Sequence, residues 1–429
     1  MNFNLKESIL VIYIFTAIFA PPILPFNILY ILFGIASLFC VVRQKKIRVS
    51  KSNQNVVNLL FIFLLYVLIV VLLNELMDVT ELLTSNRIIV IYQTYVLMPM
   101  QFIVGFFIVD QINLKKRNEI DFIRCVIYAG LIEAGLVVIS FIIPSVRDVF
   151  LQSIMIHGGT ARAYGDDAVL LYRGYGWADT LLDTFGYGMG ILSGVCLLYE
   201  KLGKIRYFWM TLFLFSTIIN SRTGIAIFMI AVLIWAIKNV RSKRATDIFK
   251  PILYFFIFLI LAYVIISLGI IDKSTVDWVM TGFTSIWNFI TGTEVAYSVG
   301  SMQNSLLSSR FWVLPDSLLG LLLGRGHSLF GTRQILGYNS DVGYINYIWI
   351  CGVLGLGLLI WLCLKWFKNS ITSATNGAMK NVRIFLCFAF FLMFIKGNVI
   401  SHTAGTFLTI LICIYKKTYQ NGVADNDIG

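Results

Sequence analysis

The chain has 429 residues, of which 58% are hydrophobic and 13% are charged. Soluble proteins carry about 25% charged residues, so this composition excludes a large soluble enzyme and favours a polytopic membrane protein. The formal net charge of +12 does not indicate a nucleic-acid partner, because the basic residues are distributed over many short segments between apolar runs.

Apolar runs predict an all-α protein with about twelve membrane-spanning helices in a single membrane domain, residues 1–429. The first run is interpreted as a retained span rather than a cleaved signal peptide, because the next run follows at once after a proline-rich turn at 21–25. The approximate cores are 5–24, 26–42, 56–73, 88–109, 122–143, 181–199, 205–220, 223–238, 251–271, 343–364, 384–397 and 402–415.

Lys and Arg residues predict the orientation of these spans. With the N-terminus inside, the inner segments hold 24 basic residues and the outer segments hold 10. Both termini are therefore expected in the cytoplasm. Two outer loops are long, residues 144–180 and residues 271–342 between the ninth and tenth spans. The second includes an amphipathic stretch at 275–292, with apolar residues at helical spacing, which predicts a helix lying in the outer interface.

The two sides also differ in the kind of basic residue. Lys outnumbers Arg 16 to 8 on the predicted inner side, whereas Arg outnumbers Lys 8 to 2 on the predicted outer side. Arg binds phosphate or carboxylate through two parallel hydrogen bonds and stays charged when partly desolvated. Single outer arginines also occur as interfacial anchors. The excess as a whole predicts an anion-binding site on the outer side.

No motif for a soluble enzyme, a nucleotide or a metal is present, so neither a metal nor a cofactor is expected. The seven cysteines lie in or beside apolar runs and predict neither disulfides nor a metal site. All three histidines, His157, His327 and His402, map to the outer side. His327 follows Arg325 in a Gly-x-Gly turn and is the candidate general base.

Two outer turns join pairs of short apolar runs. One contains Arg222, and the other contains Lys396 and His402. A run of about 14 residues spans roughly 21 Å of a hydrocarbon core of about 30 Å, so these turns are expected below the outer surface. Charged groups at such depth usually face a cavity, which predicts one outward-facing recess lined by these three residues.

Three segments, taken together and in this order, resemble the O-antigen polymerase (Wzy-type) family, relatives of the O-antigen ligases. The first is SRTG, residues 221–224. The second is SSRFWVLPDSLLGLLLGRGHSLFG, residues 308–331, and the third is NSDVGYINYIWICGVLGLGLL, residues 339–359. The Arg173-x-x-Gly176 element before the sixth span also fits.

The resemblance implies a metal-independent glycosyltransferase in the bacterial inner membrane, with its active site facing the periplasm. It would transfer the growing glycan from undecaprenyl pyrophosphate to the terminal sugar of another lipid-linked repeat unit, with inversion. The implied partners are the undecaprenyl-pyrophosphate-linked oligosaccharide, the lipid bilayer and a separate chain-length regulator. The resemblance assigns pyrophosphate binding to four arginines, Arg173, Arg222, Arg310 and Arg325. It assigns catalysis to Arg310 and to His327 as the general base, with Asp341 as the alternative base.

Two alternatives remain open from the sequence. An O-antigen ligase would use the same chemistry with a lipid A-core acceptor. A lipid-linked oligosaccharide flippase would be a transporter of similar length, with short loops on both sides and charges buried in mid-helix. The long arginine-bearing outer loops favour the enzyme over the transporter.

Overall fold

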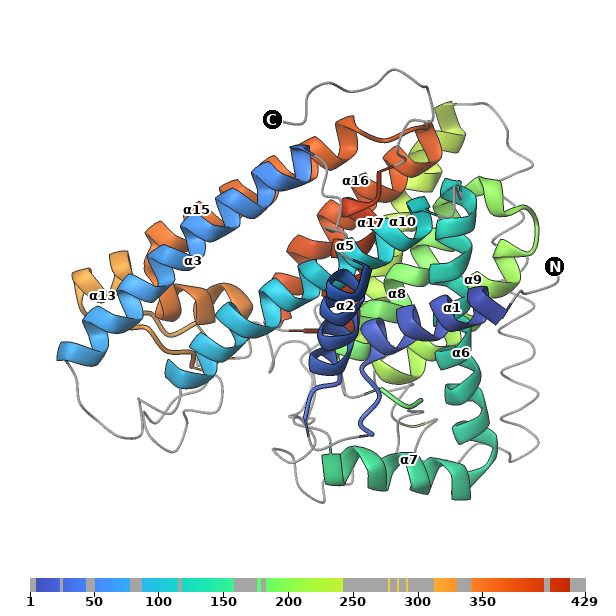
Figure 1. Cartoon of the computed structure of the whole chain (residues 1–429), viewed down its shortest axis with the longest axis horizontal. Helices are drawn as coiled ribbons and strands as arrows, with labels where there is room; N and C mark the ends of the chain where they lie inside the picture. Colours follow the sequence, from blue (N-terminus) through green and yellow to red (C-terminus); the bar gives the residue numbers. More distant parts are fainter. Residues whose placement is uncertain are drawn as a thin grey trace.

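The structure is a computed structural model. It describes residues 5–23, 26–43, 51–77, 87–114, 118–157, 176–178, 183–241, 277, 284, 291, 312–329, 340, 342–396 and 402–416. Helices dominate this part of the chain, which contains no β-strand. The expectation of an all-α protein is therefore confirmed for the described residues (Figure 1).

Among the residues that the structure describes, four helical segments are long and apolar enough to cross a membrane by length and composition. They are α3 (Lys51–Met77), the segment Arg87–Asn113, α6 (Glu119–Ile142) and α15 (Gly343–Thr372). The segment Arg87–Asn113 contains a π-helical stretch, η1 (Tyr92–Leu97), and most of α5 (Met98–Leu114).

The remaining helices that coincide with predicted spans are shorter. They are α1 (Leu5–Phe19), α2 (Leu29–Arg43), α8 (Asp183–Leu198), α9 (Arg206–Asn220), α10 (Arg222–Arg241), α16 (Gly377–Met393) and α17 (Ala404–Ile414). Helices thus cover eleven of the twelve predicted segments, and the ninth, 251–271, lies outside the described residues. How many of them cross the membrane stays a prediction.

Glycines on α8 allow neighbouring helices to approach closely. Gly186, Gly190 and Gly194 recur every four residues and therefore share one face of the helix. A Cβ atom added to Gly190 would lie 2.4 Å from the carbonyl oxygen of Gly224 on α10. On another face, a Cβ atom at Gly188 would lie 2.7 Å from that of Ala404 on α17. Small residues at this spacing drive helix association in apolar surroundings, so α8 is the centre of the bundle.

Side chains from four other helices satisfy the backbone carbonyls at the end of α17. The carbonyls of residues 413–416 accept hydrogen bonds from Ser370, Asn53, Arg383 and Asn113, which belong to α15, α3, α16 and α5 respectively. The last carbonyls of a helix lack partners within it, and leaving them unpaired in apolar surroundings costs several kcal/mol each. This end of α17 therefore joins five helices.

The predicted outer loop 144–180 begins with a helix, α7 (Pro144–His157), rather than with irregular chain. Pro144 suits the first helical position because its missing N–H would have no partner there. Figure 1 shows α7 lying across the end of α6. Trp177, further along the same loop, stacks on Phe150 of α7 with ring centroids 6.0 Å apart.

Most of the predicted amphipathic helix at 275–292 lies outside the described residues. Asp277, Thr284 and Thr291 are described, and each is helical and exposed. Their spacing of seven places them on one helix face, as expected for the polar side of such a helix.

We predict opposite effects for two glycine-to-alanine substitutions in the bundle. Gly190→Ala would press its new methyl group on the backbone of α10 and is expected to destabilise the fold by about 1–3 kcal/mol. Gly135→Ala in α6 has no heavy atom within 4 Å of its new Cβ atom. It should stabilise the protein by about 0.5–1 kcal/mol through helix propensity. Thermal unfolding in detergent measures both, and equal midpoints for the two variants would contradict the close approach.

Candidate functional site

The Gly324–Arg325–Gly326 turn inserts into a break in α15. The backbone of Gly352 departs from the helix there, with φ 68° and ψ 178°. A Cβ atom at Gly352 would lie 2.1 Å from the carbonyl oxygen of Leu322. One at Gly324, whose φ is 91°, would lie 2.6 Å from the backbone nitrogen of Gly352. Both positions therefore require glycine, for left-handed backbone and for contact between two main chains.

Hydrogen bonds from the turn replace those that the break removes from α15. The backbone N–H groups of Arg325 and Gly326 donate to the carbonyls of Trp349 at 2.6 Å and Ile350 at 3.2 Å. The next carbonyl, of Cys351, accepts from the Tyr66 hydroxyl of α3 at 3.0 Å. Irregular backbone in a membrane helix persists only where such groups find partners. The segment 317–326 is therefore built into α15, and α3 closes the break from the other side.

The turn fixes Arg325 beside a short helix, α13 (Leu318–Leu323). Ser317 caps the start of α13 by accepting a hydrogen bond from the N–H of Gly320 at 3.0 Å. The half-buried guanidinium of Arg325 donates to the same Ser317 hydroxyl at 3.0 Å. The cation is thus held in place, and its partial exposure leaves it open to an anion.

His327, the predicted base, lies inside the protein. Its exposed fraction is 3%, its ring packs on Trp349 with centroids 5.3 Å apart, and its Nδ1 atom lies 3.3 Å from the carbonyl oxygen of Ser328. A general base must come within about 3 Å of the hydroxyl it deprotonates. In this conformation His327 contributes packing, and a catalytic role requires the turn to open.

Asn346 is a structural residue of this site that the sequence reasoning missed. Its side-chain oxygen accepts from the Ser328 hydroxyl at 2.8 Å and from the N–H of Leu329 at 2.9 Å. Its amide donates to the carbonyls of Ser340 at 2.8 Å and Val342 at 3.0 Å. The signal in the sequence is a side-chain amide, that of Asn346, within an otherwise apolar run. Asn346 therefore links residues 328 and 329, which precede the segment 330–339, to residues 340 and 342, which follow it.

Residues in or just after the two predicted outer turns pack on the same helix, α8. Ser221, directly before Arg222, packs on Gly186 of α8, where an added Cβ atom would be 2.0 Å from that of Ser221. Ala404, two residues after His402, packs on Gly188. The structure thus brings the starts of α10 and α17 together on the first turns of α8. Of the two helices flanking Arg222, α9 is short with 15 residues, but α10 has 20 and is longer than predicted.

His402 joins the end of α1 to this region. Its Nε2 atom lies 2.8 Å from the carbonyl oxygen of Ala17, and 5% of the residue is exposed. With Nε2 donating, the Nδ1 atom is an acceptor, and it has no hydrogen-bond partner among the described residues. Lys396 ends a short 3₁₀ helix, η7 (Phe394–Lys396), whose Phe394 ring lies 5.1 Å from that of Tyr344 on α15.

Figure 1 shows α13 at the end of the arm formed by α3 and α15, whereas α8 lies in the bundle. Arg325 and His327 therefore occupy a different region from the α8 contacts that position the turns before α10 and α17. The predicted site residues Arg173, Arg310 and Asp341 lie outside the described part of the chain. Arg222 and Lys396 are placed by their backbone.

A second missed residue is Glu133, in the middle of α6. It is 0% exposed, and among the described residues the backbone N–H of Trp177 is the polar group near its carboxylate, outside good hydrogen-bond geometry. The carboxylate packs on Gly176, where a Cβ atom would lie 2.1 Å from Oε1. Gly176 thus leaves room for the acid. An ionisable residue inside a predicted span is a functional-site hypothesis by default, and this was the available signal.

Neither a protein-family model, nor a curated protein, nor a solved structure matches this chain. Within the described part of the chain, no group of three His, Cys, Asp or Glu residues is placed to hold a metal ion. The chemistry of the site therefore has to be argued from its own residues.

We predict that Gly352→Ala disrupts the insertion of the 324–326 turn. Alanine is strained at this backbone conformation, and its methyl group meets the Leu322 carbonyl, so a destabilisation of about 3 kcal/mol or more is expected. Gly357→Ala is the matched control on the same helix, with no heavy atom within 4 Å of its new Cβ atom.

The measurement is maleimide labelling of Cys351, which is 0% exposed beside the break, read by peptide mass spectrometry. Labelling should rise in Gly352→Ala and stay low in Gly357→Ala. A Gly352→Ala protein with unchanged labelling and unfolding midpoint would show that α15 tolerates a continuous helix here.

Proposed function

We propose that this protein is an O-antigen polymerase of the bacterial inner membrane. It transfers the growing glycan from undecaprenyl pyrophosphate to the terminal sugar of a second lipid-linked repeat unit, on the periplasmic side. The observation that carries the proposal is the excess of arginine over lysine, 8 to 2, on the predicted outer side. The order of the motifs around the large loop at 271–342 supports it.

The reaction needs neither ATP nor a metal ion, because the sugar pyrophosphate is already activated. The acceptor hydroxyl attacks the anomeric carbon, the bond to the pyrophosphate oxygen breaks, and the anomeric configuration inverts. Negative charge then gathers on the leaving pyrophosphate. Fixed arginines stabilise that charge most strongly where water is excluded, which is the role proposed for Arg173, Arg222 and Arg310.

The packing around α8 supports a role for two of the proposed site residues. Gly224, the last residue of the SRTG motif, and Ser221, the first, are both explained by contact with the glycines of α8. Within the motif, Arg222 is the residue that this proposal assigns to the substrate. His402 precedes the neighbouring helix α17, whose Ala404 packs on Gly188 of α8, and the recess itself stays a prediction.

Arg325 lies in a different region from the α8 contacts before Arg222, so in this proposal the two arginines bind different parts of the two lipid-linked substrates. The guanidinium of Arg325 is held by Ser317 and its backbone by α15, so the cation is positioned before any substrate binds. Preorganised donors stabilise a developing charge without reorganising during the reaction. Proton removal from the acceptor belongs in this proposal to His327 after the turn opens, or to Asp341.

Glu133 favours a second candidate function, a lipid-linked oligosaccharide transporter. Glu133 is a buried carboxylate in mid-helix with no ion-pair partner in the described part of the chain, and such carboxylates are typical of proton-coupled transport. The O-antigen ligase remains an alternative with the same donor chemistry, and no described residue distinguishes its acceptor from that of a polymerase.

Deleting the gene and separating lipopolysaccharide on a gel tests these functions against one another. A polymerase deletion should leave core carrying a single repeat unit. Bare core with polymerised glycan stranded on its carrier would instead identify a ligase, and a block in export of the unit would identify the transporter.

We expect Arg310→Ala to abolish long chains at normal protein level. Removal of one preorganised donor typically costs about 10²–10³ in rate. Arg310→Lys should also be impaired, because a lysine cannot form two parallel bonds to phosphate. Arg147→Ala is the control, since this predicted outer arginine already lies 3.7 Å from Asp148. A full ladder of chains in Arg310→Ala would rule out the assignment.

Glu133→Gln separates the enzyme from the transporter. The amide keeps the shape of the side chain but cannot bind and release a proton, and burying it costs less than burying a carboxylate. For the polymerase we expect normal unfolding and chain length in this variant. Blocked export of repeat units, in a protein that folds normally, would favour the transporter.

A further inference from the structure

The short helix α13 exposes a row of leucines, although the sequence assigns it to the polar outer loop 271–342. Leu318, Leu319 and Leu322 are 73%, 59% and 39% exposed, and their spacing places them on one side of the helix. Two residues before the helix, Trp312 and Leu314, are exposed as well. An exposed apolar patch of this kind marks a surface in contact with a partner or with a membrane.

The break in α15 gives the depth of this segment in the predicted membrane. Gly324, directly after α13, packs on the backbone of α15 at Gly352, and α15 continues beyond this point as a regular helix. The first charged residues of α15, Lys365 and Lys368, mark the predicted inner boundary and follow Gly352 by 13 and 16 residues. These separations correspond to about 20–24 Å of helix. Since the hydrocarbon core is about 30 Å thick, the break lies inside it, below the predicted outer boundary.

The neighbouring helix α3 gives the same depth independently. Gly326 packs on Val71, since a Cβ atom added to the glycine would lie 3.1 Å from the Cα atom of Val71. The apolar span of α3 begins at Val56, and the 15 residues between them correspond to about 22 Å of helix. The ion pair of Glu75 with Arg87 lies one helix turn further out. Figure 1 shows the arm of α3 and α15 oblique to the bundle, and such a tilt brings the turn closer to the middle of the membrane.

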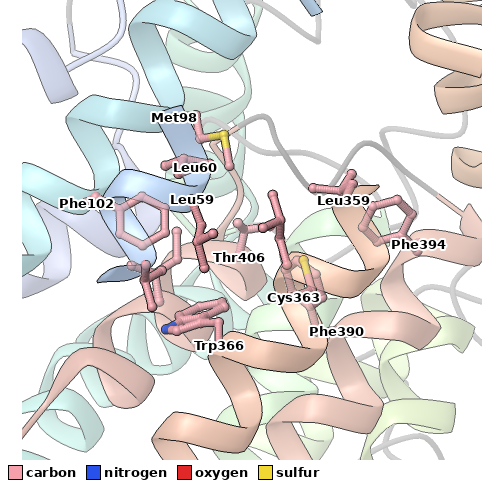
Figure 2. A pocket seen from close by; sticks show the side chains of 13 residues that line it. Leu59, Leu60, Met98, Phe102, Leu359, Cys363, Trp366, Phe390, Phe394 and Thr406 are labelled. Carbon is pink, nitrogen blue, oxygen red and sulfur yellow. The ribbon is translucent and has the colours of Figure 1, made fainter. Parts of the chain in front are cut away.

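The part of the arm between the break and the predicted inner boundary is apolar on both its inner and its outer faces. Figure 2 shows Leu59 and Leu60 of α3 with Leu359 of α15 around an apolar pocket. On the outward faces, Phe61 of α3 and Leu354 of α15 are 66% and 55% exposed, as expected for helices that face lipid. Leu354 lies two residues after the break, so the leucines of α13 adjoin this lipid-facing surface.

The charged groups of this segment gather at the start of α13, away from the break. The backbone of Arg325 lies at the break, but its side chain runs back along α13. A Cβ atom at Gly320 would lie 2.8 Å from its Nε atom, and its guanidinium donates to Ser317 at 3.0 Å. Asp316, the preceding residue, is exposed. Arginines in membranes often take this course, with the stem along apolar surface and the charge at the polar end.

We propose that residues 316–326 form a re-entrant segment that dips into the membrane from its predicted outer side, rather than part of a loop in water. The leucines of α13 contact the acyl chains of the outer leaflet. Two spans that pack on the 324–326 turn place it at hydrocarbon depth, which identifies lipid as the occupant of this surface. The inference rests on the predicted membrane boundaries and is independent of the proposed reaction.

Collision measurements on spin-labelled cysteines in phospholipid vesicles test the proposal. Oxygen concentrates in hydrocarbon, whereas a nickel chelate stays in water, so the ratio of their collision rates reports the surroundings of the label. Leu319→Cys should give a ratio several-fold higher than Lys204→Cys, which is exposed in the turn before α9. It should match Leu354→Cys, on the outward face of α15. The unsubstituted protein supplies the background signal from its own cysteines.

Two other results at Leu319→Cys would each overturn the proposal. Preferential collision with the nickel chelate, as at Lys204→Cys, would place α13 in water. Infrequent collision with both reagents would show that a protein surface, from this chain or from a second copy, covers the leucines. Thermal unfolding checks that the labelled variants fold. Leu318→Cys, at the most exposed leucine of α13, provides the same measurement if Leu319→Cys does not fold.

Discussion

The arrangement of this protein depends on the need to pair backbone polar groups inside apolar surroundings, where no water is available to replace a lost partner. The constraint is met in two places by unrelated means. At the break in α15 the backbone of the 324–326 turn donates to the carbonyls of Trp349 and Ile350. At the end of α17 the donors to the backbone carbonyls are side chains, among them that of Arg383. Each solution ties together elements that are distant in sequence.

The break in α15 also shapes the candidate site. A continuous helix would offer no place for residues 317–326, and Arg325 would then lie on a loop without support. The glycines at 324 and 352 allow the two main chains to touch, and Asn74 of α3 donates to the carbonyl of Gly324 at 3.3 Å. Arg325 is thereby held rigidly, whereas His327 is buried by the same packing. One constraint thus favours the arginine as a functional group and disfavours the histidine.

The bundle around α8 has a different physical origin. Its helices approach closely because glycine and alanine replace large side chains at their contacts, which increases dispersion contacts between backbones. This packing brings the turns before α10 and α17 together. The absence of a side chain at Gly176 likewise leaves room for the buried carboxylate of Glu133. Two of the candidate groups, Arg325 and Glu133, therefore lie beside glycines that are required by packing.

The sequence by itself determined the helical class and, among the described residues, the positions of the helices in the apolar runs, because hydrophobic runs follow directly from solvation. The side-specific distribution of Arg and Lys stays a prediction. The sequence did not reveal the break at Gly352, the burial of His327 or the complete burial of the Glu133 carboxylate. These properties depend on which distant residues are neighbours. In the sequence, a glycine within an apolar run is consistent with a straight helix. Only the tertiary structure shows that a second backbone segment packs against Gly352 and that the helix breaks there.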